Sequence, residues 1–292
     1  MKPAIINKIL KAKIKVTIVS LTFAILTLSC QKKESTTTGN PLVSLKIASS
    51  LSSTPVAMHS LKEWLKKIII PESMATPPPT MTDVVGNVVT LDQGWIVIKE
   101  IELEETETPG LDEVDGNKVL FTGPYVVDLF SVQPSVIGDI SLNMTSIRRI
   151  KMKLHRLESL PASTPEGLNQ NSLYFHGTVG AINFSLTSTD GSEFSIGGAK
   201  ALNVHDNMNL LLSIRIIPLI NKIDLTPLLS QSSGVIVSDS NPISGSSCPD
   251  IDASSTTIYD CFRKGLEKQG NLGEDTDGSD DIETNEDSVR DP

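Results

Sequence analysis

Apolar and polar residues alternate with a period of two along much of the chain, and this pattern predicts short β-strands. The clearest example is residues 150–155, where Ile150, Met152 and Leu154 alternate with two lysines and a histidine. The predicted strands are 42–48, 87–92, 94–104, 119–121, 125–130, 147–157, 172–179, 181–186, 193–196 and 209–217. Many short strands separated by turn residues are typical of a β-sandwich or barrel. The sequence therefore predicts a mainly β fold.

A different spacing, of three and four residues, sets apart the segment 56–70 and predicts an amphipathic helix. Pro55 stands near its start and Pro71 at its end, as proline often does at helix boundaries. We expect this helix to pack on the sheet through Trp64. The alternative is a helix lying in a membrane interface, as amphipathic helices with lysines and a tryptophan do.

Charged residues form a row on each of two predicted strands. The acidic row is Glu100, Glu102 and Glu104, and the basic row is Lys151, Lys153 and His155. If the two strands are neighbours, opposite charges face each other, and each pair contributes roughly a few tenths of a kcal/mol. We therefore expect a solvated, ion-paired β face rather than a binding site.

The first 29 residues have the organisation of a secretory signal peptide. Five lysines come before an uncharged apolar run at 16–28, and no acid occurs in this segment. The small residue Ser29 follows the run. The run is too short for a membrane span, which needs about 20 apolar residues. A buried N-terminal helix is the alternative, but lysines next to a wholly apolar run suit export better.

Residues 26–30, Leu-Thr-Leu-Ser-Cys, resemble the lipobox of bacterial lipoproteins, with a relaxed spacing similar to that of spirochaete lipoproteins. The usual motif has leucine three residues before the cysteine, where this chain has Thr27. The resemblance implies cleavage before Cys30, diacylglycerol on its thiol and an acyl group such as palmitate on its amino group. Because several acyl chains give stable anchoring, we expect a lipid-anchored protein of the cell envelope, at the outer membrane on its periplasmic or outer face. The alternative is an ordinary signal peptide with an incidental cysteine.

The other two cysteines, Cys248 and Cys261, form an even pair in an oxidising compartment, which predicts a disulfide. Closing a loop of about 15 residues stabilises a fold by roughly 3 kcal/mol in the chain-entropy model. A zinc site is the alternative, and it lacks a second Cys or His pair nearby. We expect no metal site and no cofactor.

Composition divides the chain around a predicted β domain at 42–229. Residues 30–41 form a polar tether, because a segment this polar cannot bury enough apolar area to fold. Residues 230–247 are a Ser/Gly/Pro linker, and residues 248–272 a small disulfide-closed module with a helix. Residues 273–292 hold nine acids and one arginine, which predicts a disordered acidic tail.

Parts of the β domain resemble a family of bacterial envelope lipoproteins of unknown function. The similar stretches are 94–105, 125–129, 146–154 and 210–217. The resemblance covers residues 42–229, although the tyrosine of the family's Ile-Arg strand is missing here. It implies an antiparallel, transthyretin-like β-sandwich into which the helix at 56–70 is inserted. The family has no agreed activity, so the resemblance bears on fold and location alone.

The net charge of the chain limits the kinds of molecule that it is expected to bind. The charge is −10 for the whole chain and becomes −15 once the five lysines of the signal peptide are removed. Such a protein repels phosphate backbones, so nucleic acid is not an expected partner. Aromatic residues make up 4% of the chain, which argues against surfaces that stack bases or sugars. The expected attachment is to a membrane through Cys30, with any protein partner left unidentified.

The sequence contains no recognisable catalytic motif. Gly-x-Ser-x-Gly, His-Glu-x-x-His and phosphate-binding glycine loops are all absent. The four histidines are scattered, and we expect surface or hydrogen-bonded side chains; they are His59, His155, His176 and His205. Convergence of His176 and His205 in space is left open. We expect a non-catalytic binding, adhesion or structural role, and the alternative is an envelope hydrolase whose residues meet only in the folded chain.

The run 275–281, Asp-Thr-Asp-Gly-Ser-Asp-Asp, resembles a calcium-binding loop, in which acids alternate before a glycine. One early Asp is missing before Gly278 when that residue is taken as the glycine of the motif. We therefore expect a solvated tail without a metal, with weak calcium binding as the alternative.

Overall fold

The computed structural model describes residues 40–50, 78–105, 118–131, 133–189, 191–282 and 286–290. The fold is mainly β, with 48% strand and 14% helix, which confirms the predicted class at this level. Residues 39–292 belong to one compact unit. The expected signal peptide at 1–29, Cys30 and the expected helix at 56–70 lie outside the described residues. Among the helices of the described part, none has the length and apolar character that a membrane crossing requires.

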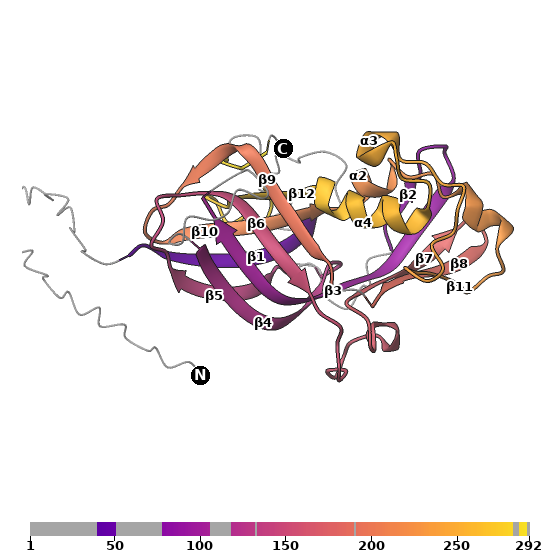
Figure 1. The fold of residues 1–292 in the computed structure, drawn as a ribbon, viewed down its shortest axis with the longest axis horizontal. Coiled ribbons are helices and arrows are strands. Elements are labelled where there is room, and N and C mark those ends of the chain that lie inside the picture. The colour runs from indigo at the N-terminus through magenta and orange to yellow at the C-terminus, as the bar shows by residue number, and fades with distance from the viewer. Residues whose placement is uncertain are drawn as a thin grey trace, which may run out of the picture. The chain divides into compact units, whose positions relative to one another are not determined.

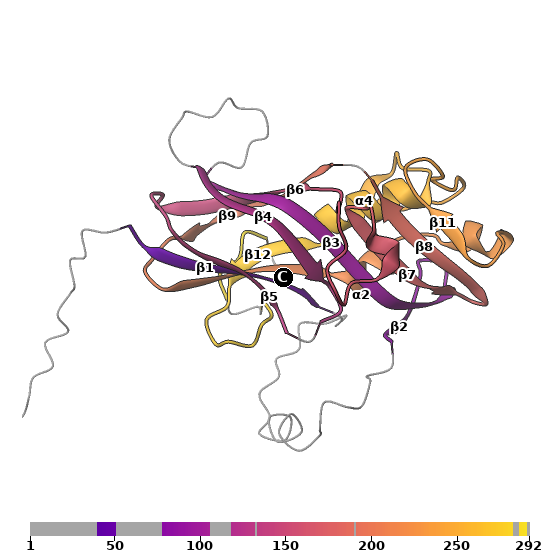
Figure 2. The same cartoon turned by 90° about the horizontal axis from the view of Figure 1, so that it is seen from below.

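Two curled sheets build this unit (Figures 1 and 2). One has four strands in the order β12-β10-β1-β5. The other has eight strands, with β11-β8-β7-β3-β6-β9 in order and with β2 and β4 paired to β3. The strands are β1 (Leu42–Ser50), β2 (Thr80–Thr82), β3 (Val88–Glu104), β4 (Lys118–Asp128), β5 (Ser135–Ser141), β6 (Ser146–Leu154), β7 (Leu173–Val179), β8 (Ile182–Ser188), β9 (Glu193–Asn203), β10 (Met208–Arg215), β11 (Val235–Val237) and β12 (Gly270–Glu274).

Both sheets are mixed, so the predicted all-antiparallel arrangement is wrong. β1 runs parallel to β10, and β11 runs parallel to β8, whereas the other pairs are antiparallel. The strands of each parallel pair lie far apart in the sequence, and only a long connection lets two neighbouring strands run in the same direction. Alternation within a strand predicts where strands are, but it carries no information on such distant pairing.

β3 joins the two halves of the larger sheet. It has 17 residues, pairs with β7 along its first part and with β6 along its second, and has β4 along its other edge (Figure 2). The register shifts between Leu91 and Gln93 and between Ile98 and Glu100, and such bulges bend a strand. The sheet therefore curls, and it brings β4 and β9 towards the two edges of the smaller sheet.

The core lies between the inward faces of the two sheets. In β1, Val43, Leu45 and Ile47 are at most 1% exposed, and the residues between them are more accessible, as the period-two pattern predicts. In β3, Ile101 and Leu103 are completely buried. Burying each side chain of this size contributes roughly 1.5–3 kcal/mol, so the sheets are held together chiefly by this layer.

Helical segments lie between the later strands. They are the 3₁₀ turns η1 (Glu166–Leu168) and η2 (Thr226–Ser230) and the helices α2 (Ile216–Ile220), α3 (Pro249–Asp252) and α4 (Ile258–Lys268). The side chain of Thr257 caps α4 by accepting a hydrogen bond from the Asp260 N–H at 3.1 Å. This cap explains why the helix begins at Ile258.

The segment 248–272 belongs to the main core and is not a separate module. Phe262 of α4 packs edge-to-face on Phe175 of β7, with ring centroids 4.8 Å apart. Leu266 lies in the same core. A module this short cannot bury a large apolar helix face by itself, so the helix is part of the β unit. The predicted linker 230–247 likewise contributes a strand, β11.

The C-terminal segment is packed where the structure describes it. β12 pairs antiparallel with β10, and Ile282 and Val289 are 5% and 0% exposed. The prediction of a disordered tail over 273–292 is therefore wrong for 273–282 and 286–290. The many charged residues of the segment predict disorder, but its apolar side chains Ile282 and Val289 are buried in the fold.

Candidate functional site

The two charge rows lie side by side, because β3 and β6 are neighbours. Glu100 is opposite Lys153, and Glu102 is opposite Lys151. Lys153 Nζ lies 2.6 Å from the Glu100 carboxylate. The predicted pairing of the rows is thus confirmed, while His155 lies just beyond the end of β6.

The prediction that this face is solvated is wrong at Glu102 and Glu104. Glu102 and Glu104 are 7% and 2% exposed, and Arg149 is 3% exposed. Arg149 and Lys151 both pair with Glu104, the latter at 2.6 Å. Lys118 pairs with Glu102 at 2.7 Å. Each buried acid is matched by at least one cation, so the charge rows hold neighbouring strands together.

The histidines do not form a common site. His176 on β7 pairs with Asp92 on β3, with Nδ1 2.6 Å from Oδ1. His205, in the turn after β9, lies with Nε2 2.9 Å from Glu274 of β12. The carbonyl of Asp206 and the Glu274 carboxylate raise the pKa of His205. His176 and His205 therefore pair with different carboxylates on different parts of the fold, and His59 lies outside the described residues.

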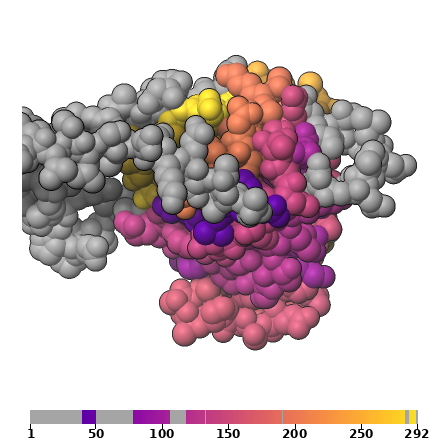
Figure 3. Space-filling model, turned by 90° about the vertical axis from the view of Figure 1, so that its left-hand side faces the viewer, coloured from indigo at the N-terminus to yellow at the C-terminus, as the bar shows by residue number. Residues whose placement is uncertain are grey.

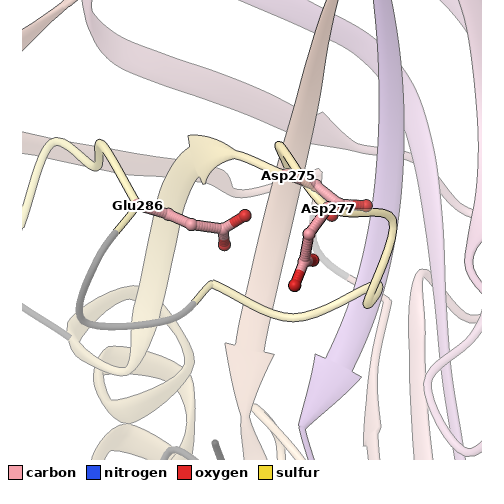
Figure 4. Close-up of side chains that lie close together, drawn as sticks. All are labelled: Asp275, Asp277 and Glu286. Carbon is pink, nitrogen blue, oxygen red and sulfur yellow. The ribbon is translucent and has the colours of Figure 1, made fainter. Parts of the chain in front are cut away.

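A carboxylate cluster lies in the loop that follows β12. Asp275, Asp277 and Glu286 place their ligand oxygens within 4.8 Å of one another. Figure 4 shows the two aspartates together, with Glu286 pointing towards them from across the loop. Asp275 and Glu286 are 2% and 7% exposed, whereas Asp277 is exposed. These residues are the ones in the described part of the chain that could hold a metal ion.

The loop is shaped by its own side chains. Asp275 Oδ1 accepts hydrogen bonds from the N–H groups of Gly278 at 2.8 Å and Ser279 at 3.1 Å. Asp277 Oδ1 accepts one from Ser279 at 2.9 Å. Gly278 and Asp280 have φ values of 74° and 62°, a left-handed conformation that Gly, Asn and Asp tolerate best. The backbone therefore curls around the two aspartates.

Glu286 connects the far end of the loop to its start. Its Oε1 accepts hydrogen bonds from the N–H of Thr276 at 2.7 Å and from the Thr276 hydroxyl at 3.0 Å. This contact brings Glu286 beside Asp275. Burial raises the pKa of Asp275, and the negative charges of Glu286 and Asp280 raise it further. The loop thus gathers negative charge in a buried position.

Asp275 has no cationic partner among the described residues, a property that it shares with the buried Asp83. Glu104 is equally buried but is paired with Arg149 and Lys151. Among the described residues, the hydrogen-bond donors to Asp275 are backbone N–H groups. Burial of a carboxylate is costly, and the N–H groups of Gly278 and Ser279 offset part of that cost at Asp275.

The spacing of the oxygen ligands agrees with a twelve-residue calcium loop, which takes ligands from positions 1, 3, 5, 7, 9 and 12. Counting from Asp275 puts Asp277 third, Ser279 fifth and Glu286 twelfth. The sharp turn at position six falls on Asp280, whose φ is positive. With Gly278 as the sixth residue the motif lacks an acid, whereas with Asp275 as the first residue Glu286 stands at position twelve.

The predicted disulfide is present between Cys248 and Cys261, which lie 13 residues apart. The two cysteines are 1% and 0% exposed, so the bridge is structural. It ties the start of α3 to α4.

Comparisons of the chain with protein-family models, with curated proteins and with solved structures give no match. The resemblances to the lipobox and to transthyretin-like envelope lipoproteins therefore rest on the residues quoted above.

Proposed function

We propose that the chain is a lipid-anchored protein of the bacterial cell envelope, held at the outer membrane through Cys30, with a non-catalytic binding, adhesion or structural role. The observation that carries this proposal is the succession of five lysines, the apolar run 16–28 and Cys30. A transthyretin-like arrangement of the two sheets is part of the same proposal. β1 begins at Leu42, so an extended tether would keep the folded unit within about 40 Å of the lipid.

Exchange of the N-terminal segment tests the anchor. In one variant of the full chain, an ordinary cleavable signal peptide replaces residues 1–29 and Cys30 becomes alanine. We expect this variant in the soluble periplasm and the native chain in the outer-membrane fraction. A control variant carries the signal peptide of another lipoprotein and keeps Cys30, and it should stay with the membrane. Membrane association of the Cys30→Ala exchange variant equal to that of the native chain would refute the anchor.

We further propose that the loop between Asp275 and Glu286 binds a divalent cation, with Ca²⁺ the preferred ion. The support is the burial of Asp275 without a cationic partner in the described part of the chain, together with the ligand register. Carboxylate and hydroxyl oxygens suit Ca²⁺, which takes six to eight oxygen ligands, better than Mg²⁺, which demands near-octahedral geometry and keeps several waters. The cation would neutralise the charge that the loop concentrates.

Calorimetric titration tests this cation site. The full chain in detergent, freed of metal with EDTA and then dialysed, is titrated with CaCl₂ and separately with MgCl₂. We expect one Ca²⁺ per chain with a Kd of about 10⁻⁴–10⁻³ M, the range of extracellular calcium modules, and weaker Mg²⁺ binding. Asp275→Asn should weaken Ca²⁺ binding at least tenfold, whereas Asp239→Asn, at an exposed acid elsewhere, should not. Absence of a saturable heat at 10 mM Ca²⁺ would exclude the site.

A further inference from the structure

One end of the folded unit exposes apolar side chains at a turn, where polar residues and glycine are usual. The turn between β2 and β3 has the sequence Asp-Val-Val-Gly-Asn, and its valines, Val84 and Val85, are 44% and 58% exposed. Val88, the first residue of β3, is 54% exposed, and Leu229 of η2 is 43% exposed. These four residues are called the apolar tip below.

Three chain segments meet at the apolar tip. The N–H of Gly180, in the turn between β7 and β8, donates to the Val88 carbonyl at 3.0 Å. A Cβ atom added at Gly180 would lie 3.4 Å from the Leu229 side chain. The Asn87 side chain donates to the Thr226 hydroxyl of η2 at 3.1 Å. The four side chains of the tip therefore belong to one continuous surface.

Backbone hydrogen bonds hold the two valines of the turn in place. Asp83 is buried, and its carboxylate accepts from the N–H groups of Val85 at 3.1 Å and Leu225 at 3.0 Å. The N–H of Val84 donates to the Ile223 carbonyl at 3.2 Å. Because the turn is already fixed to the segment before η2, the tip pays little ordering entropy when it binds.

The apolar tip is uncharged although the chain is acidic. The segments that form it, 84–88, 180–183 and 226–236, contain no Asp, Glu, Lys or Arg, whereas 21% of the chain is charged and its net charge is −10. A charged side chain resists transfer out of water far more strongly than an uncharged one. This end of the unit can therefore leave water without desolvating a charge from these segments.

The apolar tip lies at the opposite end of the unit from the start of β1. β2 is at the right of Figures 1 and 2, and β1 begins at the left. Figure 3 looks onto that left-hand end, with the indigo residues of β1 in view. β3 starts at the tip, and its 17 residues span at most about 55 Å. The tip is therefore distant from the point where the chain enters the fold.

We propose that the apolar tip docks onto a lipid bilayer, with Val84 and Val85 at the boundary between headgroups and acyl chains. Four aliphatic side chains cover far less than the roughly 1,200 Å² of a stable protein–protein interface. The tip also has none of the aromatic and arginine residues that dominate such interfaces. Binding to a bilayer scales with the inserted apolar area and needs no shaped partner.

This contact is separate from the proposed lipid on Cys30 and does not depend on it. If both are made on one membrane, the folded unit lies along the bilayer rather than standing on it, because the two contacts are at opposite ends. A weak contact is then sufficient, since the anchor already concentrates the tip at the membrane surface.

An environment-sensitive NBD fluorophore at the tip tests the docking. Residues 1–29 are replaced by a histidine tag and Cys30 by alanine, and the chain is held on phosphatidylcholine/phosphatidylglycerol vesicles through a nickel-chelating lipid. The result is thus independent of acylation. Val85→Cys carries the fluorophore in one variant. Val136→Cys, at an apolar residue of β5 that is 69% exposed, carries it in the matched control.

We expect the fluorophore at residue 85 to become severalfold brighter on vesicles and to be quenched by spin-labelled lipid, with no change at residue 136. Adding Val84→Asp should abolish the gain. No gain at residue 85, or an equal gain at both positions, would overturn the docking. A gain that occurs without vesicles and grows with protein concentration would show that the tip contacts a second copy, and it would overturn the docking as well. Absence of lipid on native Cys30 would remove the anchor and leave this result unaffected.

Discussion

Glu104 on β3 and Arg149 on β6 lie opposite each other and form an ion pair in which the side chains are 2% and 3% exposed. Lys151 adds a second cation to the same carboxylate at 2.6 Å. The pair sits on the face of the sheet that carries the charge rows, away from Ile101 and Leu103 in the core. Its effect on stability therefore depends on desolvated charges rather than on apolar packing.

Removing one partner of this pair should destabilise the fold strongly. Arg149→Met leaves the buried Glu104 with Lys151 alone, and we expect the free energy of unfolding to fall by about 3–5 kcal/mol. The double variant Glu104→Leu/Arg149→Leu should lose much less, because no charge stays buried without its partner. Urea unfolding followed by circular dichroism measures both. Lys153→Met, at a lysine whose side chain is 45% exposed, is the control and should cost under about 1 kcal/mol. Equal losses in all three variants would contradict the account.

The disulfide should be a substantial part of the stability of the C-terminal helices. Cys248→Ala/Cys261→Ala opens a loop of about 15 residues, for which chain entropy predicts a loss of roughly 3 kcal/mol. Urea unfolding of the oxidised native chain and of the double variant gives the difference. A loss below 1 kcal/mol would mean that packing of α4 on Phe175 fixes the helix without the bridge.

Asp83 should be a structural acid of the turn between β2 and β3. It is 4% exposed and accepts hydrogen bonds from the N–H groups of Val85, Asn87 and Leu225 at 3.1, 2.8 and 3.0 Å. We expect Asp83→Ala to lower the free energy of unfolding by about 2–3 kcal/mol, because buried N–H groups lose a charged acceptor. Asp239→Ala, at an exposed acid, should change it by less than about 0.5 kcal/mol. Thermal or urea unfolding that does not distinguish the two variants would refute this role.

The stabilisation of the fold by Ca²⁺ should depend on pH through Asp275. Burial and the neighbouring acids raise the pKa of this residue above 3.8. A carboxyl group with a raised pKa in the folded state adds stability below its unfolded pKa, and this contribution is lost as pH rises through the folded pKa. Without divalent cations, the repulsion between the ionised carboxylates of the loop should therefore be greatest near pH 7. Ca²⁺ should raise the Tm, relative to EDTA, more at pH 7 than at pH 4. Scanning calorimetry at both pH values measures this difference, and equal Tm shifts would contradict it.

Alternation and spacing along the chain predicted those parts of the fold that depend on nearby residues. Ile150, Met152 and Leu154 do point into the core, and the charge rows on β3 and β6 do face each other. The burial of Glu104 was not predictable, because a local pattern does not show what covers a sheet face. The parallel pairing of β1 with β10 depends on partners far apart in the sequence.

The C-terminal segment was misjudged for a related reason. Its many acids predict disorder, yet its contacts are a few long-range ones, such as the guanidinium of Arg290 on the carbonyls of β9 and α4. No local count of charges reveals such contacts. Asp275 and Asp277 stand out in the sequence, but the prediction there was a solvated tail without a metal, with weak calcium binding as the alternative. Glu286 was missed because Gly278, rather than Asp280, was taken as the turn residue of the loop.

The central claim, an envelope protein anchored by lipid on Cys30, is tested most directly by metabolic labelling with palmitate together with intact-mass analysis. The full chain and Cys30→Ala are expressed in a bacterium grown with labelled palmitate. The account predicts label on the native chain, none on Cys30→Ala, and a native mass equal to a chain that begins at Cys30 plus its acyl groups. A native chain without label, with the mass of residues 1–292 or of an unmodified cleaved form, would contradict it.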